Sequence, residues 1–544
     1  MNLNWMFAIK YMLAILLAWY VSSYFGFDKP YWSMMTVAII GYPDLSLSLA
    51  KMGARLVGSL IGVIAVTLIA NVSLNDQWLF TSLIIVWLST CLFLTLTSRY
   101  MMQYMFSLSG YTSAIIAFGT SVYPLPMTIF KLSQERLMEV TIGIVAYTFI
   151  MYVLPSKRHP FQSQLVKNKI QTEKKQALSE LFKGDRDNTV KYVNDIITSS
   201  IAYDELSKYE SNFISFKKTN SQVFKLPMFI TFIMLGLADK GILKYKGYSQ
   251  FISIKNKTNR DFDSSCYDFF DWTDAFSNTM RLVLSLIISV VFWFNTGWDY
   301  GYILAVLVSI SFTFGITIPK ANKLAFIIFI VALFVIAVSY VLKFYFLIQV
   351  SSFSQAALVM IPIFLLLGIL KTTGKLSFLI SHVMCISIIF LINFTNPMSF
   401  DFVAFSNTAI ALAFSIIIVI LMLCIIPLSS AEQVENRKLN FIYGKINKFL
   451  ENGNEISKLK NTIIVNLSSF SKSKNVSTLY VLLSLLNVYE LSQSQEMKDM
   501  LIGVITQVLK GDNKTKILSL LESKNSKIDD VNIRYTKNIL AFLC

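Results

Sequence analysis

The chain has 544 residues, of which 55% are hydrophobic and only 15% are charged, whereas soluble proteins carry about 25% charged residues. Together with a mean hydropathy of +0.58, this composition excludes an ordinary soluble protein and predicts that most of the chain lies in lipid. The formal net charge of +16 is accounted for by Lys and Arg that hold loops in the cytoplasm. We therefore expect no nucleic-acid partner.

Apolar runs of about 17 to 25 residues, the length that crosses a bilayer as a helix, recur along the sequence. The runs are continuous rather than alternating, which predicts helices and not a closed barrel. The first run, residues 11–27, is followed by Asp28 and contains no small-residue cleavage site. We therefore expect an uncleaved first membrane span.

The apolar runs and their polar breaks predict twelve membrane spans in two series of six. The first series covers residues 8–26, 31–48, 54–71, 78–97, 102–121 and 137–154, and the second covers residues 280–296, 301–318, 324–343, 354–370, 376–394 and 404–427. The predicted fold is therefore an all-α polytopic membrane protein that is embedded in the lipid bilayer.

Two polar regions separate and follow the two series of spans. They predict a first six-span unit at 1–155, a helical domain at 156–278, a second six-span unit at 279–428 and a second helical domain at 429–544. Apolar residues recur at helical spacing in both polar regions, so each is expected to form a small helical bundle.

Lys and Arg residues of the short loops set the predicted orientation. With both termini in the cytoplasm, the inner loops carry more of these residues than the outer loops, including Lys51, Arg55 and Lys371. Positive charge is retained on the cytoplasmic side of a membrane. We therefore expect both termini and both polar regions to lie in the cytoplasm.

The two series of spans resemble each other. A shift of 271 positions aligns Lys10 with Arg281, Gly26 with Gly297, Asp28 with Asp299 and Tyr31 with Tyr302, and a shift of 272 aligns Glu135 with Asn407. Many transport proteins build their pathway at the interface between such internal repeats. Because each series has an even number of spans, the two predicted repeats are parallel.

Sequence motifs of catalysis are absent. The chain has no Gly-rich phosphate loop, no nucleophile elbow and no cluster of Cys and His, and its five cysteines are scattered. We therefore expect the protein not to be an enzyme and to have no catalytic residues, cofactor or metal site.

Five acidic residues are candidates for proton uptake. Asp28 and Asp299 follow the first span of each series, and Asp401 precedes the last span. Glu135 and Glu139 lie on one helix face at the start of the sixth span. The structural alternatives are a tight outer loop with aromatic anchors around Asp28 and an ion pair between either glutamate and the neighbouring arginine.

Three cations are candidates for an anion pathway. Lys10 and Arg281 open the first and seventh spans, and Arg55 lies at the cytoplasmic edge of the third. Such side chains donate charge-assisted hydrogen bonds to a carboxylate, whereas the alternative role is anchoring at the membrane interface. His382, within the eleventh span, is either a proton relay or a packing residue.

Small residues recur every four positions along the third predicted span, at Ala54, Gly58 and Gly62. Small side chains at this spacing form a groove in which a second membrane helix can approach the backbone closely. We therefore predict that this face of the span serves helix packing.

The residues around the first hairpin and the third span resemble the fusaric acid resistance family of aromatic acid exporters. The resemblance lies in the segment GFDKPYW at 26–32, in Lys51, Arg55, Gly58 and Gly62, and in residues 396–407 before the last span. It implies an inner-membrane efflux transporter of small organic anions, in particular aromatic carboxylic acids. It also implies an ion gradient as driving force and a periplasmic adaptor (membrane fusion) protein as partner.

In the exporter hypothesis, the anion enters from the cytoplasm, passes the three candidate cations and leaves near the acids of the outer loops. Protons or the membrane potential drive it, since the potential contributes about 2.3 kcal/mol per charge at 100 mV. One alternative is an anion channel, because plant channels of the aluminium-activated malate type also resemble the chain. The other is a membrane scaffold for cytoplasmic partners. We expect a homo-oligomer, namely a dimer.

Overall fold

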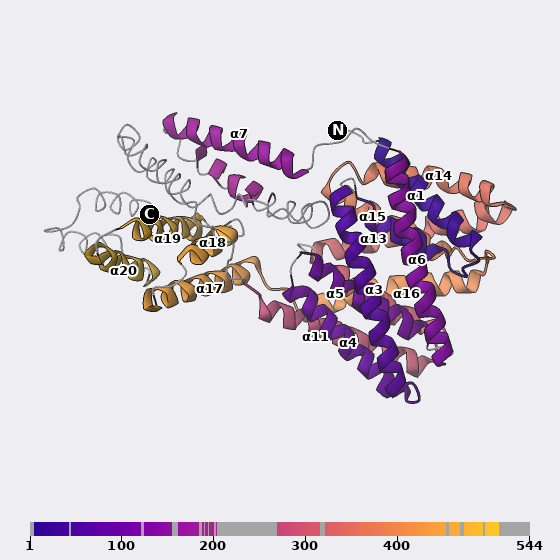
Figure 1. The fold of residues 1–544 in the computed structure, drawn as a ribbon. Coiled ribbons are helices and arrows are strands. Elements are labelled where there is room, and N and C mark those ends of the chain that lie inside the picture. Colours follow the sequence, from indigo (N-terminus) through magenta and orange to yellow (C-terminus); the bar gives the residue numbers. More distant parts are fainter. Residues whose placement is uncertain are drawn as a thin grey trace. The chain divides into compact units, whose positions relative to one another are not determined.

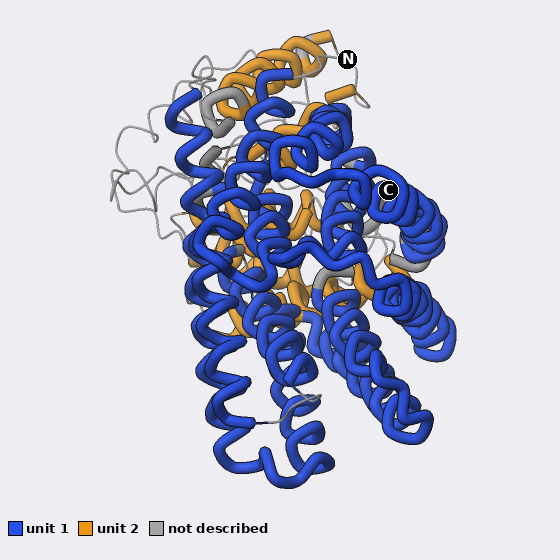
Figure 2. The backbone as a smooth tube through the Cα atoms, turned by 90° about the vertical axis from the view of Figure 1, so that its right-hand side faces the viewer, with its two compact units in different colours: residues 1–159, 271–428 blue, residues 160–270, 429–544 orange. Residues whose placement is uncertain are grey.

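A computed structural model describes residues 5–42, 45–98, 100–120, 125–154, 162–183, 188–189, 191–193, 195–200, 203, 269–315, 321–452, 456–467, 470, 473–492 and 495–510. The regular elements in these ranges are helices, without a strand, which confirms the all-α class. Contacts divide the chain into two compact units (Figure 2). Unit 1 comprises residues 1–159 and 271–428, and unit 2 comprises residues 160–270 and 429–544.

Each of the twelve predicted spans overlaps a helix of unit 1 (Figure 1). The first half contains α1 (Trp5–Tyr24), α2 (Tyr31–Ile40), α3 (Leu45–Ser73), α4 (Gln77–Thr97), α5 (Tyr100–Gly119) and α6 (Pro126–Val153). The second half contains α11 (Trp272–Thr296), α12 (Gly301–Gly315), α13 (Ala321–Val341), the π-helix η3 (Leu342–Phe346), the 3₁₀ turn η4 (Leu347–Gln349), α14 (Phe353–Leu370), α15 (Lys375–Ile392) and α16 (Phe402–Ile425).

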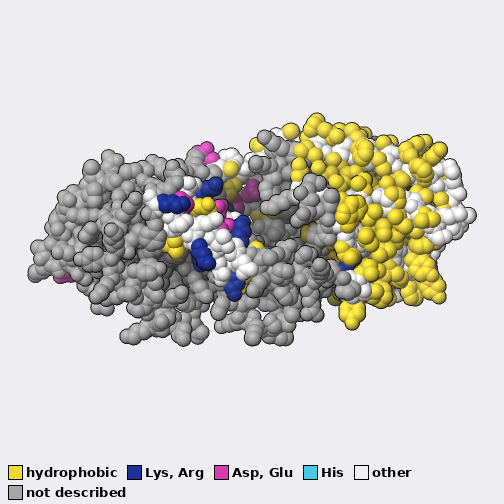
Figure 3. Space-filling model, turned by 90° about the horizontal axis from the view of Figure 1, so that it is seen from above, with side chains coloured by type: hydrophobic (Ala, Val, Ile, Leu, Met, Phe, Trp, Pro, Cys, Tyr) yellow, Lys and Arg dark blue, Asp and Glu magenta, His cyan; other side chains and the backbone are white. Residues whose placement is uncertain are grey.

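Eight helical segments within the described ranges are long and apolar enough to cross a membrane. They are α1, Lys51–Ser73 of α3, α4, α6, α11, Ala325–Gln349, α14 and α16. Hydrophobic side chains cover the face of unit 1 that Figure 3 presents, with almost no charge among them. The chain is therefore a multi-pass membrane protein, while the count of twelve spans stays a prediction.

The same turn follows the first helix of each half. Gly26, after α1, has a φ of +74°, and Gly297, after α11, has a φ of +61°. Residues with a Cβ rarely adopt this left-handed conformation, which glycine reaches without steric cost. The shift of 271 positions that aligns the two series of spans also aligns these two glycines.

The helices of the two halves also pack in corresponding pairs. Within each half, α2 lies against α1 and α6, and α12 lies against α11 and α16. Between the halves, α1 packs on α14 as α4 packs on α11, and α2 packs on α15 as α5 packs on α12. Hydrophobic cores therefore contain side chains from both halves, such as Ile15 with Phe364 and Leu88 with Leu286.

The face of α3 that carries Gly58 and Gly62 lies directly against α5. A Cβ at Gly58 would come within 2.6 Å of the carbonyl oxygen of Met105, and one at Gly62 within 2.7 Å of the carbonyl oxygen of Ser109. Ala54, one turn before Gly58, is half-buried. Only a residue without a side chain permits this approach of the two backbones.

Replacing Gly58 by leucine is expected to lower the free energy of unfolding by about 1–3 kcal/mol, because the added atoms force two helix backbones apart. Thermal unfolding in detergent measures the change. Gly119→Leu is the matched control, because a Cβ there meets no atom of the described chain within 4 Å. Equal stability of the two variants would contradict the close packing of α3 on α5.

Unit 2 is built from helices of both polar regions. They are α7 (Gln162–Lys183), α17 (Ala431–Asn452), α18 (Ile456–Leu467), α19 (Ser473–Leu491) and α20 (Gln495–Lys510). One hydrophobic core contains Ala177 and Ile196 from the first polar region together with Ile442 and Leu482 from the second. Much of the first polar region, residues 204–268, lies outside the described residues. The domain boundaries and the cytoplasmic location stay predictions.

Candidate functional site

The short helix α2 lies at the centre of the candidate site. Its ten residues are all buried, and at 1.5 Å per residue it is about 15 Å long, roughly half the thickness of the hydrocarbon core. It follows the Gly26 turn and ends at Gly41, where the backbone becomes extended. Short helices that end within the membrane form substrate sites in many transporters, because their free backbone groups line the pathway.

Arg55 of α3 points at α2 and is completely buried. Its Nη1 atom donates to the hydroxyls of Tyr111 (2.9 Å) and Tyr104 (3.3 Å), and its Nη2 atom donates to Oγ1 of Thr36 (3.3 Å). Its Nε atom has no hydrogen-bond partner in the described part of the chain. The three hydrogen-bond partners of this guanidinium are therefore neutral hydroxyls, which do not balance its charge.

Arg136 of α6 approaches α2 one turn earlier and is also buried. Its Cζ atom lies 3.8 Å from the centroid of the Trp32 ring, which gives a cation–π contact. Its Nε and Nη1 atoms, like Oε1 of the buried Glu139, have no hydrogen-bond partner among the described residues. Since Trp32 and Thr36 lie four positions apart on α2, the two arginines contact successive turns of one helix face.

Two lysines reach the opposite end of α2. Lys371, which follows α14, is buried, and its Nζ atom donates to the carbonyl oxygens of Ala38 (2.7 Å) and Gly41 (3.1 Å). Lys51 of α3 is half-buried, and its Nζ atom donates to the hydroxyl of Tyr42 (2.5 Å). Four cations from three parts of the chain thus lie beside α2, together with hydroxyls, aromatic rings, backbone carbonyls and the buried Glu139.

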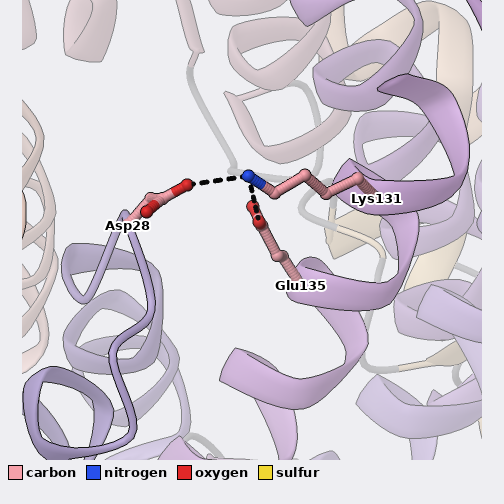
Figure 4. A network of polar contacts seen from close by, with 3 residues as sticks. All are labelled: Asp28, Lys131 and Glu135. Carbon is pink, nitrogen blue, oxygen red and sulfur yellow. Dashed lines mark hydrogen bonds and ion pairs between the residues drawn. The ribbon is translucent and has the colours of Figure 1, made fainter. Parts of the chain in front are cut away.

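Asp28 and Glu135 belong to one ion network. Lys131 pairs with Asp28 at 3.0 Å and with Glu135 at 3.5 Å (Figure 4). The side chains of Lys131 and Asp28 are 64% and 58% exposed, and ion pairs at such exposure contribute about 0.2–1 kcal/mol. This network ties the loop after α1 to the start of α6.

Lys131→Met is expected to change the free energy of unfolding by less than about 1 kcal/mol, because water screens the exposed ion pairs that it removes. Thermal unfolding at low and at high salt measures this contribution. The small difference between variant and wild type should disappear in high salt. A loss of several kcal/mol would show that the network holds the loop after α1 against α6.

The other predicted site residues have different surroundings. Arg281 donates from Nε to the carbonyl oxygen of Ile426 and from Nη2 to that of Pro427, each at 2.7 Å, and it also binds Asn278. It therefore stabilises the end of α16 and shares no partner with Arg55. Lys10 is buried on α1.

The remaining two predicted acids lie at the surface. Asp299 is exposed in the turn before α12. Asp401 is exposed as well, and its Oδ1 atom accepts a hydrogen bond of 3.0 Å from the backbone N–H of Ala404. Such a bond caps the N-terminus of α16. The structure therefore gives Asp401 a role at a helix end.

The sequence prediction of the site omitted three of the four cations around α2. Lys51 and Lys371 were interpreted as loop charges that set the orientation, and Arg136 as an ion-pair partner of a neighbouring glutamate. One available signal was their position within or directly beside apolar runs, because cations are costly there and usually have a function. Their common neighbour, α2, could not be identified from spacing.

Comparison with known proteins identifies relatives. A model of the Fusaric acid resistance protein family matches residues 4–210 and 264–452. The uncharacterized transporter YdhK of Escherichia coli K12 is 34% identical over 153 residues, which are 28% of this chain and 23% of that protein. The p-hydroxybenzoic acid efflux pump subunit AaeB of E. coli O9:H4 (strain HS) is 29% identical over 148 residues, 26% of this chain and 22% of that protein. No solved structure matches.

Proposed function

The chain belongs to the fusaric acid resistance protein family, which confirms the resemblance found in the sequence, and we propose that it is an inner-membrane efflux transporter of small organic anions, chiefly aromatic carboxylates. The matched segments span less than a quarter of the length of YdhK and AaeB. The name of AaeB, an efflux pump subunit for p-hydroxybenzoic acid, supports this substrate class. We propose no catalytic step for the protein.

The observation that carries the proposal is the pair of buried arginines beside α2. Arg55 and Arg136 both have N–H donors without a partner in the described residues. A guanidinium in the membrane interior is costly, and such residues mark ion and substrate pathways. Its planar set of donors matches a carboxylate. A carboxylate bound between these two side chains would neutralise their charge and use their free donors.

The aromatic surroundings of the arginines support the choice of an aromatic acid. Trp32 lies against Arg136, and Tyr104 and Tyr111 lie against Arg55. Ring faces attract cations and stack on other rings. An aromatic carboxylate can therefore use the charge and the rings of one site together, whereas an aliphatic acid of the same charge uses the charge alone.

The corresponding helix pairs of the two halves support a parallel repeat of two six-span units. We propose that the anion passes beside α2, at the seam where α2 packs on α15. Lys10 then remains a candidate for the cytoplasmic entrance, with both termini and unit 2 in the cytoplasm, whereas Arg281 stabilises the end of α16. A homodimer and a periplasmic adaptor protein complete the proposed export machine.

The driving force in this proposal is the membrane potential or a proton. A departing monoanion gains about 2.3 kcal/mol at 100 mV, so export is electrically downhill. Glu139 is the buried proton-carrying candidate, and it lies one turn from Arg136 on α6. Asp28, Glu135, Asp299 and Asp401 are the candidates at the outer surface.

Efflux from preloaded cells tests the proposed function. Cells that lack the protein and cells that overproduce it are loaded with a panel of radiolabelled aromatic and aliphatic acids, and the initial rate of loss is compared. We expect faster loss of some aromatic acids in the overproducing cells. Equal rates for every acid, with the protein present in the membrane, would overturn the proposal.

A channel and a scaffold remain the alternative functions, and each has a distinct signature. A channel would show a single-channel conductance in planar bilayers and would be indifferent to a pH gradient. A scaffold would retain its function when both buried arginines are neutralised. The series of cations beside α2 favours a path for anions, and therefore an exporter or a channel over a scaffold.

A further inference from the structure

A second group of side chains, distinct from the two arginines, lies where α2 ends. Lys371 and Lys51 both contribute an ammonium group there, one from the second half of unit 1 and one from the first. Lys371 Nζ lies 4.3 Å from the ring centroid of Tyr11 and 5.5 Å from that of Phe378. Lys51 Nζ lies 4.0 Å from the ring centroid of Tyr42.

Three rings at this place lie in series, a tilted pair followed by a stacked pair. Tyr42 and Phe378 have ring centroids 4.9 Å apart and an angle of 36° between their planes. Phe378 and His382 have centroids 5.8 Å apart and nearly parallel planes at 15°. The Nδ1 atom of His382 has no hydrogen-bond partner within the described residues. The stack therefore joins both lysines to a ring that can still accept or donate a hydrogen bond.

The first group and this one are connected by Tyr104. Its hydroxyl accepts a hydrogen bond of 3.3 Å from Arg55, and its ring centroid lies 5.2 Å from Lys51 Nζ. The cations beside α2 thus follow one another from Lys371 through Lys51 to Arg55, with two rings between the first pair and the ring of Tyr104 between the second. A carboxylate that moves along this series can bind the next cation before it releases the previous one.

We propose that Lys51, Lys371 and the Tyr42–Phe378–His382 stack form a selectivity site for aromatic carboxylates. The substrate carboxylate pairs with the two ammonium groups, and the substrate ring packs against this series of rings, of which Phe378 is the centre. The inference rests on the proposed function and adds the place at which an aromatic acid is distinguished from an aliphatic one. Arg55 and Arg136 then receive the anion.

The same site connects binding to the seam between the halves. Lys371 has three N–H donors, two of which hold the carbonyl oxygens of Ala38 and Gly41. The third donor can bind a carboxylate without breaking either of these bonds, and an ionised acceptor forms a strong hydrogen bond with it. A carboxylate bound to Lys371 therefore lies beside the contact that joins the end of α2 to the segment after α14.

Benzoate and cyclohexanecarboxylate are suitable probes, because they share charge and carbon count and differ in aromaticity. The ratio of their initial efflux rates from preloaded proteoliposomes is measured for wild type, Phe378→Leu and Phe390→Leu. Phe390 is a half-buried phenylalanine on the same helix, α15, and serves as the matched control. Equilibrium binding of both acids to the purified proteins gives a second reading that does not need transport.

The ratio of benzoate to cyclohexanecarboxylate is expected to fall about three- to tenfold in Phe378→Leu, the effect of losing one ring–ring contact. It should be unchanged in Phe390→Leu. An unchanged ratio in Phe378→Leu, by flux and by binding, would overturn the selectivity site and leave the exporter intact. If wild type neither transports nor binds either acid, the proposed function fails and the selectivity site fails with it.

Discussion

Arg55→Gln is expected to reduce the initial rate of aromatic acid efflux at least tenfold while the protein still reaches the membrane. A hydrogen bond between a charged donor and an acceptor contributes about 1.5–3 kcal/mol, and every 1.4 kcal/mol is a factor of about ten. Glutamine retains polar atoms for the hydroxyls of Thr36, Tyr104 and Tyr111, so the loss falls on the substrate anion. Efflux from preloaded cells, divided by the amount of protein in the membrane, measures it.

Arg55→Lys is the matched control for charge. Lysine keeps the positive charge but loses the planar set of donors that binds a carboxylate in two places, so an intermediate rate is expected. If Arg55→Gln transported at the wild-type rate, Arg55 would be only a packing residue between α2, α3 and α5. Equal rates for the lysine and glutamine variants would show that geometry, rather than charge, decides.

Arg281→Gln is expected to lower the free energy of unfolding by about 3 kcal/mol and to leave the efflux rate per folded molecule close to that of wild type. The guanidinium of Arg281 donates to two backbone carbonyls beyond the end of α16, and each bond from a charged donor contributes about 1.5–3 kcal/mol. Thermal unfolding in detergent measures the stability, and efflux is normalised to protein that elutes as a single species in gel filtration.

The two arginine variants therefore separate two roles that the sequence could not distinguish. Arg55 and Arg281 are both fully buried cations of membrane helices, but one binds side-chain hydroxyls and the other binds backbone. A rate per folded molecule as low in Arg281→Gln as in Arg55→Gln would contradict this separation. It would place Arg281 in the anion pathway, as the sequence hypothesis did.

The helices of unit 1 could be predicted because lipid imposes a strong signal. Backbone N–H and C=O groups in the membrane must form their hydrogen bonds within the segment, which favours a helix. Its side chains face lipid, so each span appears in the sequence as a continuous apolar run. The predicted segment 31–48 shows the limit of this signal. The prediction carries the span past Ile40, yet α2 ends there, before Gly41, Pro43 and Asp44, and the carbonyl of Gly41 binds Lys371, 330 positions away along the chain. No local pattern predicts such a contact.

The candidate site was only partly predictable for the same reason. Arg55 stood out because it interrupts an apolar run beside the Gly58 groove. Arg136 and Lys371 were assigned to local roles, since a neighbouring glutamate and a loop position explained them. Their relation to Trp32 and to the end of α2 depends on how α6, α14 and α15 pack, which is a tertiary property. Likewise, the shared core of unit 2 joins residues that the sequence placed in separate bundles.

The flux of benzoate through purified protein in proteoliposomes tests the central claim most directly. An imposed potential of about 100 mV, negative on the loaded side, supplies about 2.3 kcal/mol per exported charge. We predict saturable outward flux that rises with this potential in wild type and is lost in Arg55→Gln. Flux through both proteins at the same rate, or through neither, would contradict an anion path along α2.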